Sequence, residues 1–215
     1  NQLASEYDEN RFGNSYGQFI DFQERRILNK IFKNQSGKIL DLACGSGRLT
    51  NFATSGADAS EEMLKIAQKK HSVKEFFQAK SNELPFEKES FQGCLTFHFI
   101  MHLDEVIFTK TIDEVHRILS KNGTFVFDIP VKNRRKILNQ NQENWHAALS
   151  FNQDEIEKFI KNKFEIRKKF GLLIIPIHRI PKRFRKYFLT FDFLLSNFGL
   201  LKNLSSYHIY ELRKI

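Results

Sequence analysis

Apolar residues recur along this chain with two different periods, and the periods predict a succession of helices and strands. Ile, Leu and Phe recur at helical spacing over residues 18–33 and again over 104–119. Short, largely apolar runs at 38–42, 73–79, 93–99 and 124–129 have the length of strands. Because strands and helices alternate through residue 130, we expect a doubly wound, mostly parallel sheet with helices on both faces.

Polar residues at the element boundaries support this reading. Ser60 is a suitable N-cap for a helix that runs to about Lys70, with Glu61 and Glu62 in its first turn. Asp104 is a suitable N-cap for the helix that follows. The pair Asn122-Gly123 turns the chain into the 124–129 strand, and Pro130 ends that strand.

The pattern is looser after residue 130. Residues 132–149 are polar and predicted helical, and a further helix begins at Asn152. Two strands are expected at 164–170 and 206–212. Between them, residues 172–203 are apolar, basic and interrupted by two prolines, so this segment is interpreted as an insertion.

Composition narrows the class of protein. A chain of 215 residues is long enough for one domain with a substantial core. Its two cysteines, Cys44 and Cys94, argue against a disulfide scaffold and favour a reducing compartment. No run of 18 apolar residues and no signal peptide is visible, so we expect a cytoplasmic protein, with peripheral contact at the inner membrane surface as an option.

Positive charge is concentrated in the C-terminal third. The chain carries 34 basic and 25 acidic residues, and residues 158–186 hold eleven Lys or Arg with one acid, Glu165. Three interpretations are open: a solvated face, a surface that meets an anionic membrane, or a nucleic-acid site. Nucleic acid ranks last, because no recognisable nucleic-acid-binding module is present.

The segment from Lys38 to Thr50 carries the strongest candidate chemistry. An apolar strand reaches Asp41, and a turn with Gly45 and Gly47 follows. In open α/β sheets, ligands bind at the carboxyl ends of the strands, and glycines let the backbone approach them. A nicotinamide dinucleotide fits poorly, because no third glycine follows Gly47.

This segment resembles the cofactor loop of class I methyltransferases that use S-adenosylmethionine (SAM), in particular the methyltransferase type 11 domain related to ubiquinone-biosynthesis enzymes. Other segments resemble that family in the expected order. These are Tyr7-Asp8 with Arg11-Phe12, Ser55–Leu64, Leu84-Pro85-Phe86 with Ser90-Phe91, Phe97–Leu103, and Glu114–Leu119 with Asn122-Gly123.

The resemblance implies one domain over 1–215, with N-terminal cover helices in 1–36, a cofactor-binding core in 37–130 and an antiparallel last strand. It implies that SAM, released as S-adenosylhomocysteine, contacts Tyr7, Arg11, Asp41, Ala43, Cys44, Gly45, Ser46, Gly47, Asp58, Ala59, Met63, Ser81 and Phe97. Asp41 would hold the amino end and Asp58 the ribose. His102 is the candidate catalytic base, and no metal is required.

Three features depart from the family. Lys80 replaces the usual acid beside the adenine and Gln92 replaces another acid; lysine can only donate hydrogen bonds. Only eleven positions separate Gly47 from Asp58. Either the first crossover helix and second strand are shortened, or residues are missing there; the second is favoured, because a crossover needs a dozen or more residues.

The predicted function is methyl transfer from SAM to a small-molecule or lipid-linked acceptor. The alternative is a catalytically degenerate protein of the same fold that acts as a binding or scaffold partner. The identity of the acceptor, the choice among O-, N- and C-methylation, the oligomeric state and the effect of Lys80 on adenine recognition stay open.

Overall fold

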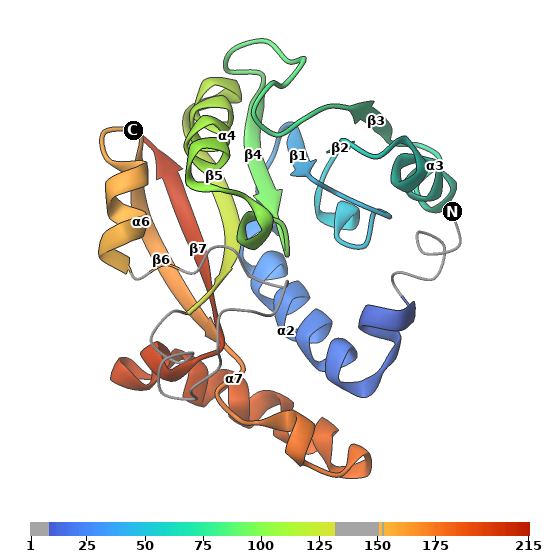
Figure 1. Ribbon diagram of the computed structural model, residues 1–215, viewed down its shortest axis with the longest axis vertical. Coiled ribbons are helices and arrows are strands. Elements are labelled where there is room, and N and C mark those ends of the chain that lie inside the picture. The colour runs from blue at the N-terminus through green and yellow to red at the C-terminus, as the bar shows by residue number, and fades with distance from the viewer. Residues whose placement is uncertain (1–8, 132–150, 152) are drawn as a thin grey trace.

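The computed structural model describes residues 9–131, 151 and 153–215, and these residues form a seven-stranded sheet flanked by helices (Figure 1). The strand order is β3-β2-β1-β4-β5-β7-β6. The strands are β1 (Ile39–Leu42), β2 (Ser55–Asp58), β3 (Glu75–Gln78), β4 (Phe91–Thr96), β5 (Leu119–Pro130), β6 (Phe164–Leu172) and β7 (Tyr207–Lys214).

Strands β1 to β5 are parallel, and β7 runs antiparallel to both β5 and β6. Thr124 to Pro130 of β5 pair with Arg213 back to Tyr207 of β7. The predicted doubly wound sheet with an antiparallel last strand is therefore confirmed.

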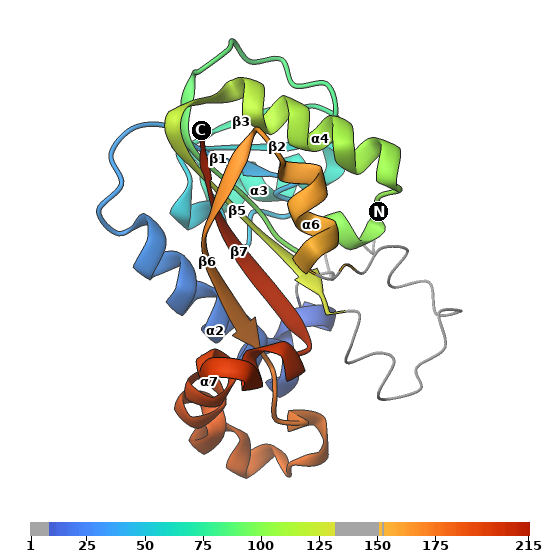
Figure 2. The ribbon, with the colours of Figure 1, turned by 90° about the vertical axis from the view of Figure 1, so that its left-hand side faces the viewer.

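Helices cover both faces of this sheet. Figure 2 shows α2 (Ser15–Phe32) on one side and α4 (Glu105–Ile118) and α6 (Gln153–Ile160) on the other. Each side has its own core: Ile27 and Leu28 of α2 are fully buried on one, and Phe108 and Ile112 of α4 on the other. The edge strand β3 and its neighbour β2 pack against α3 (Glu61–Lys70).

The capping residues act as the sequence predicts. The Ser60 hydroxyl accepts the Met63 amide of α3, and the Asp104 carboxylate accepts the Ile107 amide of α4 at 2.7 Å. Strand bounds differ more: the strand predicted at 124–129 extends back to Leu119, because the residues after α4 continue directly into the sheet. The helix predicted over 132–149 lies outside the described residues.

The crossover between β1 and β2 is short but complete. It runs over residues 43–54 and contains one three-residue helical turn, η2 (Thr50–Phe52), in place of a longer helix. Leu40, Asp41 and Leu42 still pair in parallel with Ser55, Gly56 and Ala57. The structure therefore has the first of the two alternatives, a shortened crossover: about a dozen residues join the strands when the helix is reduced to a single turn.

Side chains stabilise this short crossover. The Lys74 ammonium donates to the carbonyls of Thr50, at 2.6 Å, and Ala53. The Thr54 hydroxyl is bonded to both the amide and the carbonyl of Ile39 at 2.9 Å. These contacts satisfy backbone groups that an α-helix would have satisfied internally. Because only the short turn η2 follows the glycine loop, no long helix is present there whose dipole could favour an anion.

Insertion 173–206 connects β6 to β7 at the carboxyl ends of the parallel strands. Its root is fixed there, since Pro130 at the end of β5 pairs with Tyr207, and Tyr207 pairs with Leu172. It contains η4 (Ile177–Arg179), η5 (Lys182–Phe188), α7 (Leu189–Asn197) and η6 (Gly199–Leu204). The predicted insertion is thus a helical layer, packed mainly on α2 and β6.

Candidate cofactor site

A cavity of about 340 Å³ lies at the carboxyl ends of β1, β2 and β4. Most of its wall comes from the glycine loop and the residues that follow β2 and β4. Its lining residues are Phe12, Asp41, Ala43, Cys44, Gly45, Ser46, Arg48, Leu49, Asp58, Ser60, Met63, Phe97, His98 and Phe99.

The two glycines of the loop serve different purposes. Gly45 has φ +54°, and a Cβ added there would meet nothing within 4 Å, so this backbone is open towards the cavity. Gly47 has φ +80°, and a Cβ there would lie 3.0–3.3 Å from His71 and Ala67. Gly47 therefore lets the loop pack against α3 and does not line the cavity, whereas Gly45 gives a ligand access to the backbone.

Asp58 fixes the loop from the end of β2. One carboxylate oxygen accepts the Gly45 amide at 2.8 Å, and the other accepts the Ser60 amide at 2.9 Å. A carboxylate has about four acceptor positions, so each oxygen keeps capacity for a further donor. Asp58 can thus hold the loop and also accept hydrogen bonds from a diol in the cavity.

Asp41 is a buried acid at the floor of the cavity. Its side chain accepts the Thr50 hydroxyl at 2.6 Å. Burial raises the pKa of Asp41 from 3.8 to about 7, although the Thr50 hydrogen bond and the nearby Arg48 oppose the rise. A cationic ligand group would favour the ionised form. Burial also raises the pKa of the neighbouring Cys44 thiol, which disfavours its thiolate form.

Arg48 connects the loop to α2 through a buried ion cluster. Its guanidinium lies 2.8 Å from the Glu24 carboxylate and 2.5 Å from that of Asp21. Burial alone would raise the pKa of fully buried Glu24, but Arg48 and His98 lower it to about 2. The Phe12 ring stacks 3.9 Å from the guanidinium carbon and closes one side of the cavity.

His98 joins the same cluster from the end of β4. Because Glu24 is ionised, the 2.7 Å contact between them places a proton on His98 Nε2. His98 Nδ1 lies 3.5 Å from an oxygen of Asp128, whose pKa is raised by burial. The Asp128 carboxylate also accepts the His98 amide at 2.6 Å, which helps hold His98 at φ +55°.

Glu24, His98 and Asp128 have the donor atoms of a metal site, all within 4.8 Å of one another. The adjacent Arg48 already supplies a positive charge to Glu24. The cluster is therefore best described as an ion-paired wall of the cavity.

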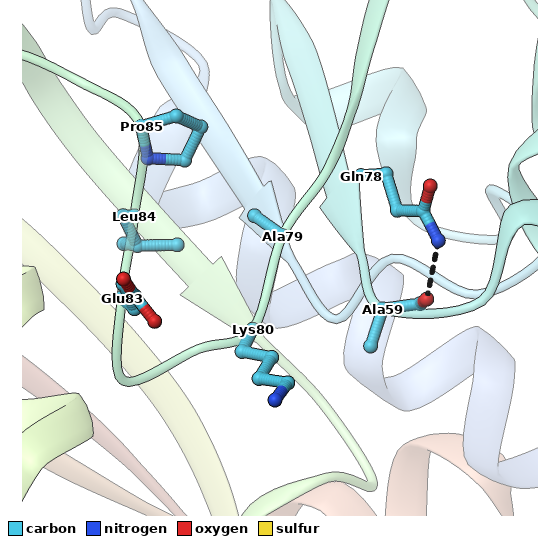
Figure 3. A pocket seen from close by; sticks show the side chains of 7 residues that line it. All are labelled: Ala59, Gln78, Ala79, Lys80, Glu83, Leu84 and Pro85. Carbon is cyan, nitrogen blue, oxygen red and sulfur yellow. Dashed lines mark hydrogen bonds between the residues drawn. The ribbon is translucent and has the colours of Figure 1, made fainter.

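A second cavity, of about 550 Å³, begins where the first ends, since Asp58 lines one and Ala59 the other. Figure 3 shows its wall, in which Gln78 Nε2 donates to the Ala59 carbonyl at 3.2 Å. Lys80, Glu83, Leu84 and Pro85 complete this side. The place that an adenine-binding acid would take thus presents a lysine.

The structure brings eight of the predicted residues to the first cavity and Ala59 to the second. Ser81 is turned away: its hydroxyl is buried against that of Thr111 at 2.8 Å. His102 is exposed on η3 (Ile100–His102) and lines neither cavity. Arg11 is half-buried beside Phe12 and also lines neither, and Tyr7 lies outside the described residues.

Sequence reasoning missed several cavity residues. They are Phe12, Arg48, Leu49, Ser60, His98 and Phe99. Phe12, His98 and Phe99 lay inside motifs already recognised, but nothing local distinguished His98 from His102. Arg48 directly follows the glycine loop, and its partner Glu24 is far away in sequence, so only the folded chain shows the pair.

The residues present fit SAM. An ammonium and a ribose diol need acidic acceptors, and Asp41 and Asp58 lie on the two sides of an open backbone at Gly45. The absence of a long helix after the loop removes the usual stabilisation of a pyrophosphate. The sheet order and this cavity define a protein of the class I methyltransferase fold.

The comparisons point to the same class of protein. Residues 40–127 match the family model of a methyltransferase domain. The chain is 33% identical over 131 residues to protein MJ1252 of Methanocaldococcus jannaschii, covering 60% of this chain and 49% of that one. It is 28% identical over 142 residues to the ubiquinone/menaquinone biosynthesis C-methyltransferase UbiE of Campylobacter jejuni, covering 59% of each.

Solved structures show the same fold. A SAM-dependent methyltransferase of Thermotoga maritima superposes with a TM-score of 0.66 and 19% identity, covering 97% of this chain and 99% of that one. At this identity the likeness shows the fold alone. The matches to the relatives above span about half of each relative's length.

Proposed function

We propose that this protein is a SAM-dependent methyltransferase. The observation that carries the proposal is the placement of Asp41, the Gly45 backbone and Asp58 around one cavity at the carboxyl ends of β1 and β2. SAM, when bound, supplies a methyl group on a sulfonium that is already an excellent leaving group, so the protein mainly has to align the reactants.

Each residue then has a defined task. Asp41 holds the ammonium group, Asp58 accepts the ribose hydroxyls, and Met63 lines the side that leads to the adenine. Lys80 cannot accept from an adenine amino group, and Ser81 is occupied by Thr111. The amide oxygen of Gln78, on the wall of the second cavity, is the better-placed acceptor.

The acceptor is proposed to be an aromatic or otherwise apolar small molecule, free or lipid-linked. Phe12, Phe97 and Phe99 give the cavity an aromatic wall, and His98 lies among them. The name of the UbiE relative, a quinone-biosynthesis C-methyltransferase, supports this class of acceptor.

Where the methyl-accepting substrate must lose a proton, we assign the general base to His98 and not to His102. Its Nδ1 atom and the neighbouring Asp128 oxygen are both buried without a hydrogen-bond partner, so a proton can be held between them. His98→Asn should lower kcat while leaving the dissociation constant of S-adenosylhomocysteine unchanged. His102→Asn is the matched comparison and should change neither; the reverse result assigns the role to His102.

Isothermal titration with S-adenosylhomocysteine tests the cofactor. We expect saturable binding that Asp58→Ala weakens by at least tenfold, while Asp104→Ala, which removes a helix cap elsewhere, leaves it unchanged. If the unaltered protein binds no S-adenosylhomocysteine, the result would favour the alternative, a catalytically degenerate scaffold protein. Lys80 is the residue that motivates this alternative. A fluorescence change with NADH would instead favour a nicotinamide enzyme.

A further inference from the structure

The outer surface of insertion 173–206 is apolar. In the part of the chain that the structure describes, twelve large apolar side chains are exposed, and eight of them lie within residues 184–204. They are Phe184, Tyr187, Phe191, Leu194, Phe198, Leu200, Leu201 and Leu204, and we call this set the apolar ridge. Such a concentration marks an interaction surface.

The ridge follows from the sequence of α7, which is apolar around most of its circumference and buries its Asp and Ser side chains. Its buried residues include Asp192 and Ser196, both fully covered, while Phe191 and Leu194 are 53% and 60% exposed. Phe191 and Leu194 lie three residues apart on one face of α7, and Tyr187 and Phe198 are exposed just before and just after that helix. A water-facing helix normally has the opposite arrangement.

Polar contacts hold α7 with this face outward. The Asp192 carboxylate accepts the Ile175 amide at 2.7 Å and the Gln23 side chain of α2 at 2.8 Å. Asn197 is bonded to both the amide and the carbonyl of Gly171 in β6. The orientation of α7 is therefore fixed by buried hydrogen bonds, and the exposed ridge is a consequence of the fold.

Cations flank the ridge and no exposed acid accompanies them. Lys182, Arg183 and Lys186 are exposed on η5, next to Phe184 and Tyr187. The insertion contains one acid, Asp192, and it is buried. Two copies of this surface, facing each other, would bring like charges together without a carboxylate to pair with them. An anionic lipid surface complements both the charge and the apolar side chains.

The ridge lies at the end of the molecule towards which β4 runs (Figure 1). Figure 1 shows β4 pointing towards the end of the molecule at which α7 lies, and β7 pointing away from it. At the root of the insertion, the Tyr207 ring packs edge-on against that of His98, with centroids 6.1 Å apart. A surface that holds the ridge would thus also lie near the carboxyl ends of the strands.

We propose that insertion 173–206 docks the protein on anionic membranes, with the ridge inserted among the lipids and the η5 cations at their headgroups. No helix among the described residues has the length and apolarity to cross a bilayer. This proposal rests on the proposed function in one respect only: it favours a methyl acceptor that is lipid-linked. Docking on the membrane does not require methyl transfer. It places the surface at 182–204, whereas the basic segment singled out from the sequence includes β6, which is part of the sheet.

Flotation with vesicles of phosphatidylglycerol and phosphatidylcholine in equal amounts tests docking. We expect the protein to float with these vesicles and not with phosphatidylcholine alone. Neutralising Lys182, Arg183 and Lys186 to Gln should lower the partition coefficient on the order of 100-fold. Phe191→Ser with Leu194→Ser should lower it at least tenfold, by removing inserted area.

Matched controls carry the same changes elsewhere. Val73→Ser with Val106→Ser removes two exposed apolar side chains, and changing Lys69, Lys70 and Lys121 to Gln removes three exposed cations. Both controls should float like the unaltered protein. Equal losses in variants and controls would overturn the proposal, because the effect would then be general.

Three other results would distinguish between the possible roles of the ridge. Failure to float, or flotation unaffected by the Phe191 and Leu194 changes, overturns docking through the ridge. A dimer that the same changes dissociate, without vesicle binding, assigns the ridge to a second copy of the chain. Titration with S-adenosylhomocysteine on the same preparations separates the proposals, since lost flotation with intact titration rejects docking alone.

Discussion

The ion cluster between α2 and the glycine loop makes a quantitative prediction for Arg48→Met. Methionine retains much of the length of arginine but removes the charge that faces Glu24, whose side chain is fully buried. The pKa of Glu24 falls from 4.5 to about 2 on folding, which corresponds to about 3 kcal/mol of stability near neutral pH. Removing one partner of a buried pair costs about 3–5 kcal/mol. We expect a loss of that size in urea unfolding at pH about 7.

The stability lost in Arg48→Met should depend on pH in a defined direction. In the unaltered protein the depressed pKa of Glu24 contributes stability above pH 4.5, and this is lost as pH falls towards about 2. Without Arg48, only the contacts with His98 oppose the burial that raises the pKa of Glu24, so this pKa lies higher than in the unaltered protein. The variant therefore has less of this stability to lose as pH falls. The gap between the two proteins should be largest near neutral pH and should narrow as pH falls towards about 2.

Two further proteins complete the test. Arg48→Met combined with Glu24→Gln should recover much of the loss, because no buried charge is left unpaired. Arg25→Met is the matched control: Arg25 pairs with Asp21 at 2.7 Å and donates to the Arg48 carbonyl at 2.7 Å but is 32% exposed, so its loss should be about 1–2 kcal/mol. The reasoning is refuted if Arg48→Met costs no more than Arg25→Met, or if the Glu24→Gln change gives no recovery.

Three other predictions concern the cofactor site. Asp58→Asn should destabilise the protein by about 1–3 kcal/mol in urea unfolding, because Gly45 and Ser60 donate to different carboxylate oxygens and the amide replaces one of these by an NH2 donor; an unchanged midpoint would contradict this. Lys80→Asp should tighten binding of S-adenosylhomocysteine by about threefold to tenfold in calorimetry, since it supplies an acceptor in the second cavity; weaker binding would exclude an adenine there. Affinity should rise as pH increases through about 7, where Asp41 ionises in the free protein, and Asp41→Asn should remove that dependence.

Features set by local sequence could be predicted well. Helices capped by Ser60 and Asp104 begin where the sequence indicates, because a cap acts within three residues. Asp58 at the end of β2 and the glycine loop after β1 could likewise be predicted to lie together, since the carboxyl ends of parallel strands meet at one edge.

Features set by distant contacts could not be predicted. Gly45 and Gly47 look equivalent in the sequence, but α3 packs against only one of them. His98 and His102 have similar surroundings in the chain, and only the position of Glu24 on α2 distinguishes them. The means of stabilising so short a crossover could not be foreseen, because Lys74, which donates to its carbonyls, comes from beyond the crossover.

The position of β7 in the sheet has a consequence for biosynthesis. This strand is made after β5 and β6 yet lies between them, bonded to both. While the chain is still being translated, β6 has no neighbour in the sheet and the outer edge of β5 is unpaired. The half-made protein therefore presents two unpaired strands, and it is at this stage that a chaperone would find the most to bind.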